Sequence, residues 1–473
     1  MFNSIIRFAQ KKVNIFCFKY FWYYDIIMQS FKCTNGGAFS MNIAKRILAV
    51  FLTLTMAVTL FTFSTGAIES QQEWIEKNWS RLLESKGSLL MTPGEDNTKM
   101  NFSWQSSYKS CKAEIEVGTK QDMSDAQKLD VDSKFNIFCF EYTHEATASE
   151  LEADTTYYYK YYADKVWSEV YSFTTASSES TKVLFVSDCQ IGRFRQGTDE
   201  EILQHDTYGW YKTMELATKS HKGINFVVSA GDQVEDSYSE KQYSLMESVP
   251  QLRNYPIAAV VGNHEFYTTN YSSHYNNPNR DTEVPFKNPA GNGYYFLYND
   301  ILFIVLDSNI VVPTTHRKII KAACEAYPNA KWKVVAMHHS PYDANAAKYF
   351  TSKITRATIT PFFDEFGIDL CLSGHDHYYS RSYIIKNNRV TDDVLTNNTY
   401  TNPKGTLYVS ANSSSGSNYN GIDTENVGPE CDFWFQSDTP CYSIMDVSGD
   451  KLTVTTYETD NNSVVDTISI AKK

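Results

Sequence analysis

Five short clusters of polar residues combine the side chains that bind metal ions in proteins. The clusters are Ser187-Asp188-Cys189-Gln190, Gly231-Asp232-Gln233-Val234-Glu235-Asp236, Gly262-Asn263-His264-Glu265, His338-His339-Ser340-Pro341 and Gly374-His375-Asp376-His377. Any one of them alone is typical of a turn or a helix cap. Together they supply carboxylate, amide and imidazole groups, and a ring of such groups is electrostatically costly unless cations neutralise it. The set therefore predicts a metal-dependent site.

Buried strands must position these clusters. Each cluster directly follows a continuous apolar run, and these runs cover residues 183–186, 225–229, 257–261, 333–337 and 369–373. A further apolar run at 301–306 and helical patterns at 199–221 and 357–366 complete the region. Strands buried on both faces and joined by helices indicate a layered α/β domain. Since ligands of open α/β sheets bind at the carboxyl ends of the strands, we expect the five clusters to converge.

The region before residue 181 has a different pattern of apolar and polar residues. An amphipathic stretch at 71–83 predicts a helix, and residues 89–175 alternate apolar and polar residues in short runs separated by turn residues. This spacing predicts an all-β, fibronectin III-like sandwich within a domain at 68–176. An α/β domain at 181–473 follows it, with a tail of alternating strands at 442–470. The fold class is thus multidomain.

The first 67 residues are predicted to be an upstream segment and a signal peptide. Lys45-Arg46 precede an apolar run at 47–63, and Ser64-Thr65-Gly66-Ala67 suits cleavage after Ala67. A membrane anchor is the alternative, because about 17 apolar residues are the lower limit for a span. Since residues 1–40 precede the signal, we expect Met41 to be the true start. We expect a secreted, extracellular protein without a stable membrane span after cleavage, with cell-surface association as the alternative.

The composition argues against several classes of protein. Hydrophobic residues make up 42% of the 473-residue chain, which argues against wholesale disorder. The net charge of −12 argues against a nucleic-acid backbone partner, which would need a basic face. Among nine cysteines there is no zinc-finger spacing, whereas Cys431 and Cys441 flank a short loop and could pair in an oxidising compartment.

In their order, the blocks DxQ, GDxxE, GNHE, VxxH and GHDH resemble those of the calcineurin-like metallophosphoesterases. The preceding region, through the runs at 155–159 and 171–175, resembles the N-terminal domain of purple acid phosphatases. The likeness extends from about residue 89 to the C-terminus. It implies a four-layer αββα catalytic domain and a small-molecule phosphate ester as substrate.

The resemblance also implies two divalent or mixed-valence metal ions, of iron, zinc or manganese. The ligands of the first ion would be Asp188, Gln190, Asp232 and His377. Asp232 would bridge to a second ion, whose other ligands would be Asn263, His338 and His375. A metal-activated water would attack the phosphorus, while His264 would stand over the phosphate and assist the leaving group.

Four positions need a separate interpretation. Gln190 stands where many relatives have His, and its amide oxygen is the weaker donor. Glu235 stands where purple acid phosphatases have Tyr, and we expect its carboxylate to orient His264. Arg193 is a candidate for binding a phosphate oxygen, with a solvated loop charge as the alternative. His339 is a candidate for lining the substrate pocket, with a core-facing position as the alternative.

The predicted activity is hydrolysis of phosphate monoesters. A phosphodiesterase or nucleotidase is the alternative within the same chemistry, since one two-metal centre serves both. A surface binding protein with a vestigial site is the alternative of another class. The intact set of expected ligands argues against it, because a vestigial site would be expected to lose a ligand.

Overall fold

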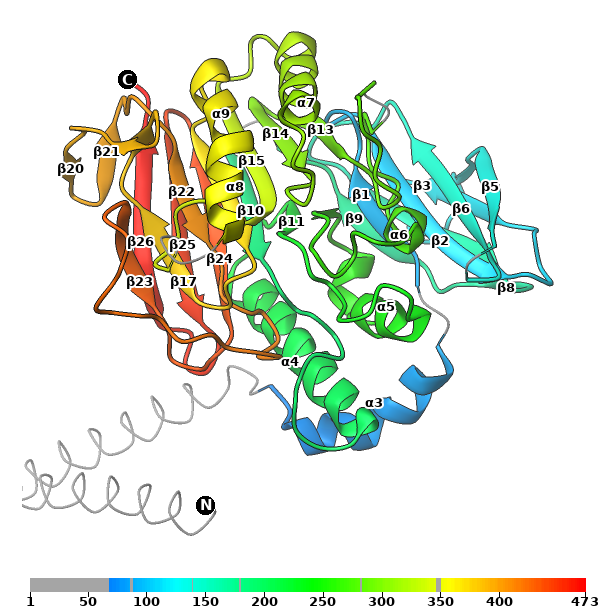
Figure 1. Cartoon of the computed structure of the whole chain (residues 1–473). Coiled ribbons are helices and arrows are strands. Elements are labelled where there is room, and N and C mark those ends of the chain that lie inside the picture. Colours follow the sequence, from blue (N-terminus) through cyan, green and yellow to red (C-terminus); the bar gives the residue numbers. More distant parts are fainter. Residues whose placement is uncertain (1–67, 86–87, 138, 178–179, 281–282, 346–349) are drawn as a thin grey trace, which may run out of the picture. The chain divides into compact units, whose positions relative to one another are not determined.

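The computed structural model describes residues 68–473, with short gaps at 86–87, 138, 178–179, 281–282 and 346–349 (Figure 1). The predicted signal sequence at 1–67 lies outside the described residues. Within the described part of the chain, no helix combines the length and apolar character needed to cross a bilayer.

The N-terminal region begins with one helix and continues as two sheets. Helix α3 (Gln71–Glu84) starts at a capping box in which Ser70 and Glu73 satisfy each other's backbone N–H groups. The first sheet has the order β1-β2-β6-β5, from strands β1 (Leu90–Pro93), β2 (Met100–Ser107), β6 (Glu141–Ala148) and β5 (Val131–Asn136). The second has the order β4-β3-β7-β8 with β9 beside β7, from strands β4 (Gln127–Lys128), β3 (Glu114–Gly118), β7 (Thr156–Ala163), β8 (Val166–Trp167) and β9 (Tyr171–Thr174). Inward-facing residues such as Phe102, Ile115 and Phe173 form their common core.

Two large sheets build the rest of the chain. The eight-stranded sheet has the order β12 (Ile257–Ala259), β11 (Phe226–Ser229), β10 (Ser180–Val186), β24 (Cys441–Ser448), β25 (Lys451–Glu458), β26 (Val464–Ala471), β21 (Thr399–Thr401) and β20 (Leu395–Thr396). The seven-stranded sheet has the order β13 (Gly293–Tyr298), β14 (Ile301–Leu306), β15 (Trp332–His339), β16 (Leu370–Gly374), β22 (Leu407–Ser410), β17 (Tyr379–Ser382) and β23 (Cys431–Phe435). A small hairpin, β18 (Ile385–Lys386) and β19 (Arg389–Val390), stands apart from both sheets.

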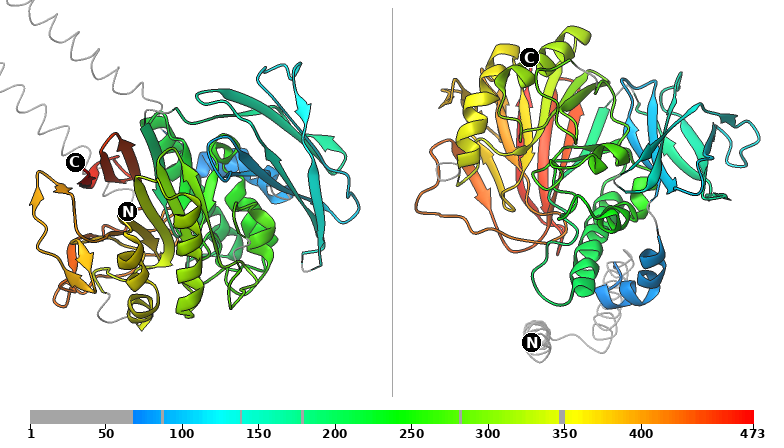
Figure 2. Two further views of the ribbon diagram at one scale, coloured as in Figure 1. Left: turned by 90° about the horizontal axis from the view of Figure 1, so that it is seen from above. Right: turned by 45° about the vertical axis from the view of Figure 1, so that its right-hand side comes forward.

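Helices cover the outer face of each large sheet (Figures 1 and 2). The helices are α4 (Asp199–Ser220), α5 (Glu240–Glu247), the 3-10 helix Pro250–Arg253, α6 (Asn270–His274), α7 (Pro313–Ala326), α8 (Phe350–Thr358) and α9 (Thr360–Phe366). Strand β10 shows why four layers form: Val183 and Phe185 face the second sheet, whereas Leu184 faces the helical layer that contains Trp210 of α4. On the other side, Ile319 of α7 packs with the outward residues of β14 and β15. The expected αββα arrangement is confirmed.

Parallel pairing brings the strand ends together. Strands β10, β11 and β12 pair in parallel, and so do β14, β15, β16 and β22. Their carboxyl ends therefore lie at one edge of each sheet, and an isolated bridge from Ser187 to Ser413 joins the two edges. The polar clusters are the segments that follow these strands, so the topology gathers them.

The suggested pairing of Cys431 with Cys441 is wrong in this structure. Both are free, as are the other five described cysteines. The physical reason is their placement, since Cys431 begins β23 in one large sheet and Cys441 begins β24 in the other.

Candidate metal centre

The backbone of the polar clusters takes an uncommon conformation. Asp188, Gln190, Asp232, His375 and His377 all have positive φ values, from 38° to 76°. Residues other than glycine rarely adopt this left-handed region, and such positions persist only where the surrounding structure holds them. These five expected ligands lie in three loops, which therefore turn sharply directly after their strands.

Two glycines let these loops approach each other. A Cβ atom on Gly262 would lie 2.0 Å from Oδ1 of Asp232, and one on Gly374 would lie 1.8 Å from Oγ of Ser187. Neither glycine has a positive φ, so the requirement is close packing rather than backbone conformation. The glycines that precede Asn263 and His375 are therefore part of the site.

The first half of the site is a cluster around His338. Its Nε2 lies 3.0 Å from Oδ1 of Asn263, 3.2 Å from Oδ2 of Asp232 and 3.2 Å from Nδ1 of His375. Its Nδ1 lies 2.8 Å from the carbonyl oxygen of Ala230, which can only accept, so the proton of the neutral ring sits on Nδ1 and Nε2 carries a lone pair. Four lone-pair atoms thus converge, and Asp232, His338 and His375 have the spacing of a metal site.

Of the other expected ligands, the structure brings Asp188 and His377 together, while the Gln190 amide contacts Glu235. His377 Nδ1 lies 3.0 Å from the carbonyl oxygen of Asn418, which leaves its Nε2 3.5 Å from Oδ1 of Asp188. Oδ1 of Asp188 and Oε1 of Gln190 are buried without a hydrogen-bond partner among the residues that the structure describes. Such orphaned oxygens are costly unless a cation or water completes them. The donor set, of carboxylates, amide oxygens and imidazoles, therefore fits metal ions.

The electrostatics agree with a site built for cations. Burial would raise the pKa of Asp232, but His338 and His264 outweigh it and hold that pKa below its ordinary value. Burial would lower the pKa of His338, but Asp232 raises it to about 10. Burial and the neighbouring His338 lower the pKa of His375 to about 3. Without metal, a proton on His338 occupies the place where a cation would sit between the carboxylate and the second imidazole.

His264 lies at the open side of the cluster, with 24% of its side chain exposed. Its backbone N–H donates to Oδ1 of Asp232, and its Nε2 lies 3.9 Å from Oδ2 of the same residue. Its Nδ1 lies 2.7 Å from the backbone carbonyl oxygen of Glu235. The carbonyl can only accept, so the proton of the neutral ring sits on Nδ1 and Nε2 carries the lone pair.

The Glu235 carboxylate, expected to orient His264, lies beside that ring but is not its nearest contact. It is the backbone carbonyl of Glu235 that holds the His264 ring, since the carboxylate lies farther away, at 3.5 Å from Nδ1. The carboxylate instead accepts from Nε2 of Gln190 at 3.0 Å, from Arg193 at 3.1 Å and from Arg195 at 2.7 Å. The two arginines come from the loop after β10, where the sequence pointed to Arg193 as a phosphate ligand and not as a partner of Glu235.

The two residues expected at the substrate lie beside the cluster. His339 is buried, its Nδ1 lies 2.9 Å from Oγ of Ser308, and its ring packs 4.5 Å from that of His375. These contacts favour a supporting position behind His375. Arg193 pairs with Glu235, while 28% of its side chain remains exposed at the edge of the site.

Two buried carboxylates position the loops and were not predicted from the sequence. Glu265 accepts the backbone N–H groups of Gly262, Asp232, Gln233 and Val234. Asp206 of α4 accepts those of Gly192, Arg193 and Phe194. Glu265 directly follows the His of its block, which was an available signal. Asp206 had none, because it lies inside a helical pattern far from any cluster.

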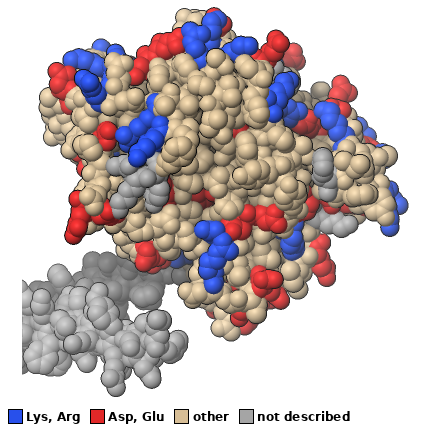
Figure 3. Space-filling model, viewed as in Figure 1, with Lys and Arg blue, Asp and Glu red and all other residues tan. Residues whose placement is uncertain are grey.

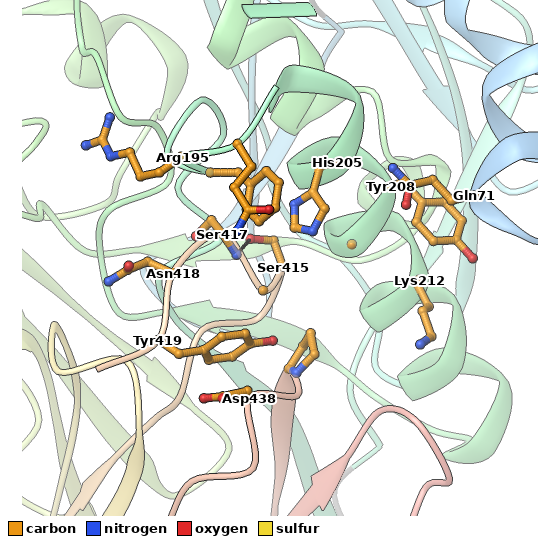
Figure 4. Close-up of a pocket in the computed structure, with 15 residues that line it drawn as sticks. Gln71, Arg195, His205, Tyr208, Lys212, Ser415, Ser417, Asn418, Tyr419 and Asp438 are labelled. Carbon is orange, nitrogen blue, oxygen red and sulfur yellow. Dashed lines mark hydrogen bonds between the residues drawn. The ribbon is translucent and has the colours of Figure 1, made fainter. Parts of the chain in front are cut away.

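A pocket of about 520 Å³ adjoins the site (Figure 4). Its aromatic wall includes Phe194 stacked on His205, together with Tyr419. Two residues of its lining reach the site directly: Arg195 bonds to Glu235, and the carbonyl of Asn418 holds His377. The pocket and the metal cluster therefore share the loops after β10 and β22.

Comparisons with known proteins agree with this architecture. Residues 181–379 match the calcineurin-like phosphoesterase family, and residues 88–175 match the purple acid phosphatase N-terminal domain. Among solved structures, a purple acid phosphatase, PPD1 from yellow lupin (Lupinus luteus), is similar with a TM-score of 0.63 at 16% identity, over 81% of this chain and 74% of that one. The structure of PhoD is similar with a TM-score of 0.56 at 12% identity, over 80% and 92%.

Curated relatives are distant. A phosphoenolpyruvate phosphatase of Allium cepa is 31% identical over 91 residues, which are 19% of this chain and 18% of that protein. Purple acid phosphatase 5 of Arabidopsis thaliana is 24% identical over 266 residues, which are 54% and 59%. The chain thus spans less than two thirds of the length of either relative.

Proposed function

The chain carries a calcineurin-like phosphoesterase domain behind a purple acid phosphatase N-terminal domain, and from this premise we propose that it hydrolyses phosphate monoesters with two bound metal ions. The observation that carries the proposal is the convergence of unsatisfied lone-pair atoms at the strand ends. Within the described part of the chain, Oδ1 of Asp188 and Oε1 of Gln190 have no hydrogen-bond partner, and Nε2 of His338 faces two oxygens.

The proposed ligands divide into two sets that share one residue. Asp188, Gln190, Asp232 and His377 would hold one ion, and Asp232, Asn263, His338 and His375 would hold the other. Asp232 suits the shared position because its carboxylate has two oxygens, one for each ion. Metal ions of this kind supply a nucleophile from water at neutral pH and neutralise the phosphoryl oxygens. Iron, zinc and manganese are the candidates.

Side chains of the protein would transfer the proton, contact the phosphate and support the ligands. With Nδ1 held by the Glu235 carbonyl, the Nε2 atom of His264 would carry the proton to the leaving oxygen. Arg193 and Arg195 lie at the edge of the site, where a guanidinium not fully used by Glu235 could contact a phosphate oxygen. His339 would support His375 from behind.

The surface supports a small substrate. On the face shown in Figure 3, lysine and arginine side chains are scattered among acidic ones and form no continuous basic stripe. A nucleic-acid backbone would need such a stripe, whereas one phosphate group needs only the local cations of the site.

Hydrolysis assays separate the proposed activity from its alternatives. The protein loaded with Mn²⁺, Zn²⁺ or iron would be tested on p-nitrophenyl phosphate and on bis(p-nitrophenyl) phosphate. We expect the monoester to have the higher kcat/KM. Preference for the diester would favour a phosphodiesterase, and no hydrolysis of either ester by metal-loaded protein would favour a binding protein.

We also propose that the protein is exported, with cleavage after Ala67. The support is the basic pair Lys45-Arg46, the apolar run at 47–63 and the small residues before Ala67. N-terminal sequencing of the mature protein from its natural host checks this. A mature chain that retains residues 47–63 would contradict it.

A further inference from the structure

The amide of Gln190 is held in one orientation. Its Nε2 donates to Oε2 of Glu235 at 3.0 Å, while its Oε1 is buried without a partner. Gln190 itself is only 1% exposed, and its backbone is in the left-handed region at φ 38°. The side chain is therefore packed in place, with one end satisfied and the other end available.

This orientation decides whether Gln190 can bind a cation. An amide has two similar ends, but only the oxygen carries lone pairs for a metal, whereas the NH₂ group would repel it. A carboxylate can only accept hydrogen bonds, so Glu235 selects the arrangement in which Nε2 faces it. The oxygen then faces away from Glu235, with its lone pairs available to a cation.

The charge of Glu235 is compensated on its other side. Arg193 and Arg195 both donate to Oε1, the oxygen that Gln190 does not use. Three backbone N–H bonds to Asp206 fix the loop that carries the first of these arginines. The two arginines thus hold the carboxylate in place and leave Oε2 for the amide.

We propose that Glu235 is a positioning residue that makes Gln190 a metal ligand. The inference rests on the proposed metal centre and deepens it. The Glu235 carboxylate fixes the orientation of the Gln190 amide, so that this weak ligand can bind the metal. The two arginines hold the carboxylate in place. Outer groups of this kind contribute about 10–100-fold to metal affinity. Glu235 itself makes no contact with the metal in this scheme.

A double-mutant cycle on metal affinity tests the proposal without substrate. Zn²⁺ and Mn²⁺ binding would be measured by chelator competition for the wild type, Glu235→Leu, Gln190→Ala and the double variant. We expect each single variant to weaken one of the two metal sites by about 10–100-fold. We expect the double variant to be no weaker than Gln190→Ala, because Glu235 acts only through that amide. Asp236→Leu, an exposed carboxylate of the same loop, serves as the control and should bind metal like the wild type.

Three outcomes would overturn the inference. Unchanged metal affinity in Glu235→Leu would show that Glu235 has no influence on the site. Additive losses in the double variant would show that Glu235 acts on the metal by a route other than Gln190. A wild-type protein that binds neither metal would remove the premise itself. Circular dichroism and thermal melting would establish that each variant is folded.

Gln190→His provides a second variant in case Glu235→Leu does not fold. An imidazole can donate one N–H to Glu235 and bind a metal through its other nitrogen, so we expect metal affinity at least equal to that of the wild type. Lower affinity in this folded variant would contradict the proposed geometry. The failure of the proposed function is distinguishable: a cycle that behaves as expected in a protein without phosphatase activity would reject the activity and keep the positioning role.

Discussion

At the scale of single residues, the metal-binding chemistry can be predicted from the types of the side chains. The contacts that hold those side chains in place cannot. The sequence contains Asp188, Asp232 and the GHDH block in an order that already predicts a metal site. The carboxylate contacts of Glu235 could not be predicted in the same way. These contacts depend on the position of the loop after β10. The Asp206 carboxylate inside α4 holds that loop by accepting its backbone N–H groups.

His264→Ala should separate catalysis from metal binding. The His264 side chain lies at the open side of the cluster and is not one of the groups whose lone pairs converge around His338. We expect turnover to fall by about 10²–10⁴, the usual contribution of a positioned proton donor, with metal content unchanged. Steady-state kinetics beside elemental analysis checks this. Metal loss in the folded variant would mean that His264 is a ligand rather than an acid.

At the scale of elements, strand order and loop packing position the ligands. The buried strands, the helices between them and the N-terminal sandwich could be predicted from apolar periodicity, because burial on one or both faces of a strand leaves a clear pattern. The pairing order of the sheets could not, since β24–β26 come from the end of the chain and insert beside β10. Long-range pairing of this kind depends on the whole sheet rather than on any local segment.

Gly262→Ala should damage the site through packing alone. An added Cβ would lie 2.0 Å from Oδ1 of Asp232 and 2.8 Å from Oε2 of Glu265, so the loops after β11 and β12 would have to separate. We expect a loss of stability of about 1–3 kcal/mol together with weaker metal binding. Thermal melting and metal titration measure both effects.

Gly421→Ala is the matched control, because its Cβ would meet no atom within 4 Å. It should leave the melting temperature and the metal affinity close to wild-type values. Equal behaviour of the two alanine variants would show that close approach at Gly262 is not required.

At the scale of the whole molecule, a network of charged groups around His274 is buried beside the N-terminal sandwich. His274 of α6 lies between Glu247 and Glu240 of α5, and its Nδ1 also lies 3.2 Å from the amide of Gln105 in the N-terminal sandwich. Burial would lower the pKa of His274, but the two carboxylates raise it to about 10. The folded state therefore binds this proton more tightly than the unfolded chain does, where the pKa of His is about 6.5.

This network should make stability depend on pH in the alkaline range. The contribution of His274 is fully present below about pH 6.5 and is lost as the pH rises through about 10. His274→Gln leaves two carboxylates without a cation, so we expect it to cost about 3–5 kcal/mol at pH 6. Urea unfolding from pH 6 to pH 10.5 measures the difference from the wild type. A difference that stays constant, or grows, toward pH 10.5 would contradict the assignment.

The central claim, a two-metal phosphatase, is tested most directly by removing and restoring the metal. Protein dialysed against a chelator would be assayed on p-nitrophenyl phosphate before and after addition of Mn²⁺, Zn²⁺ or iron, with the bound ions counted by elemental analysis. We predict loss of activity on chelation, its return with about two ions per chain, and near-background activity in Asp232→Asn under every condition, because both proposed metal sets use Asp232. Asp236→Asn, an exposed neighbour in the same loop, should behave like the wild type. Hydrolysis that survives chelation, or full activity in Asp232→Asn, would contradict the claim.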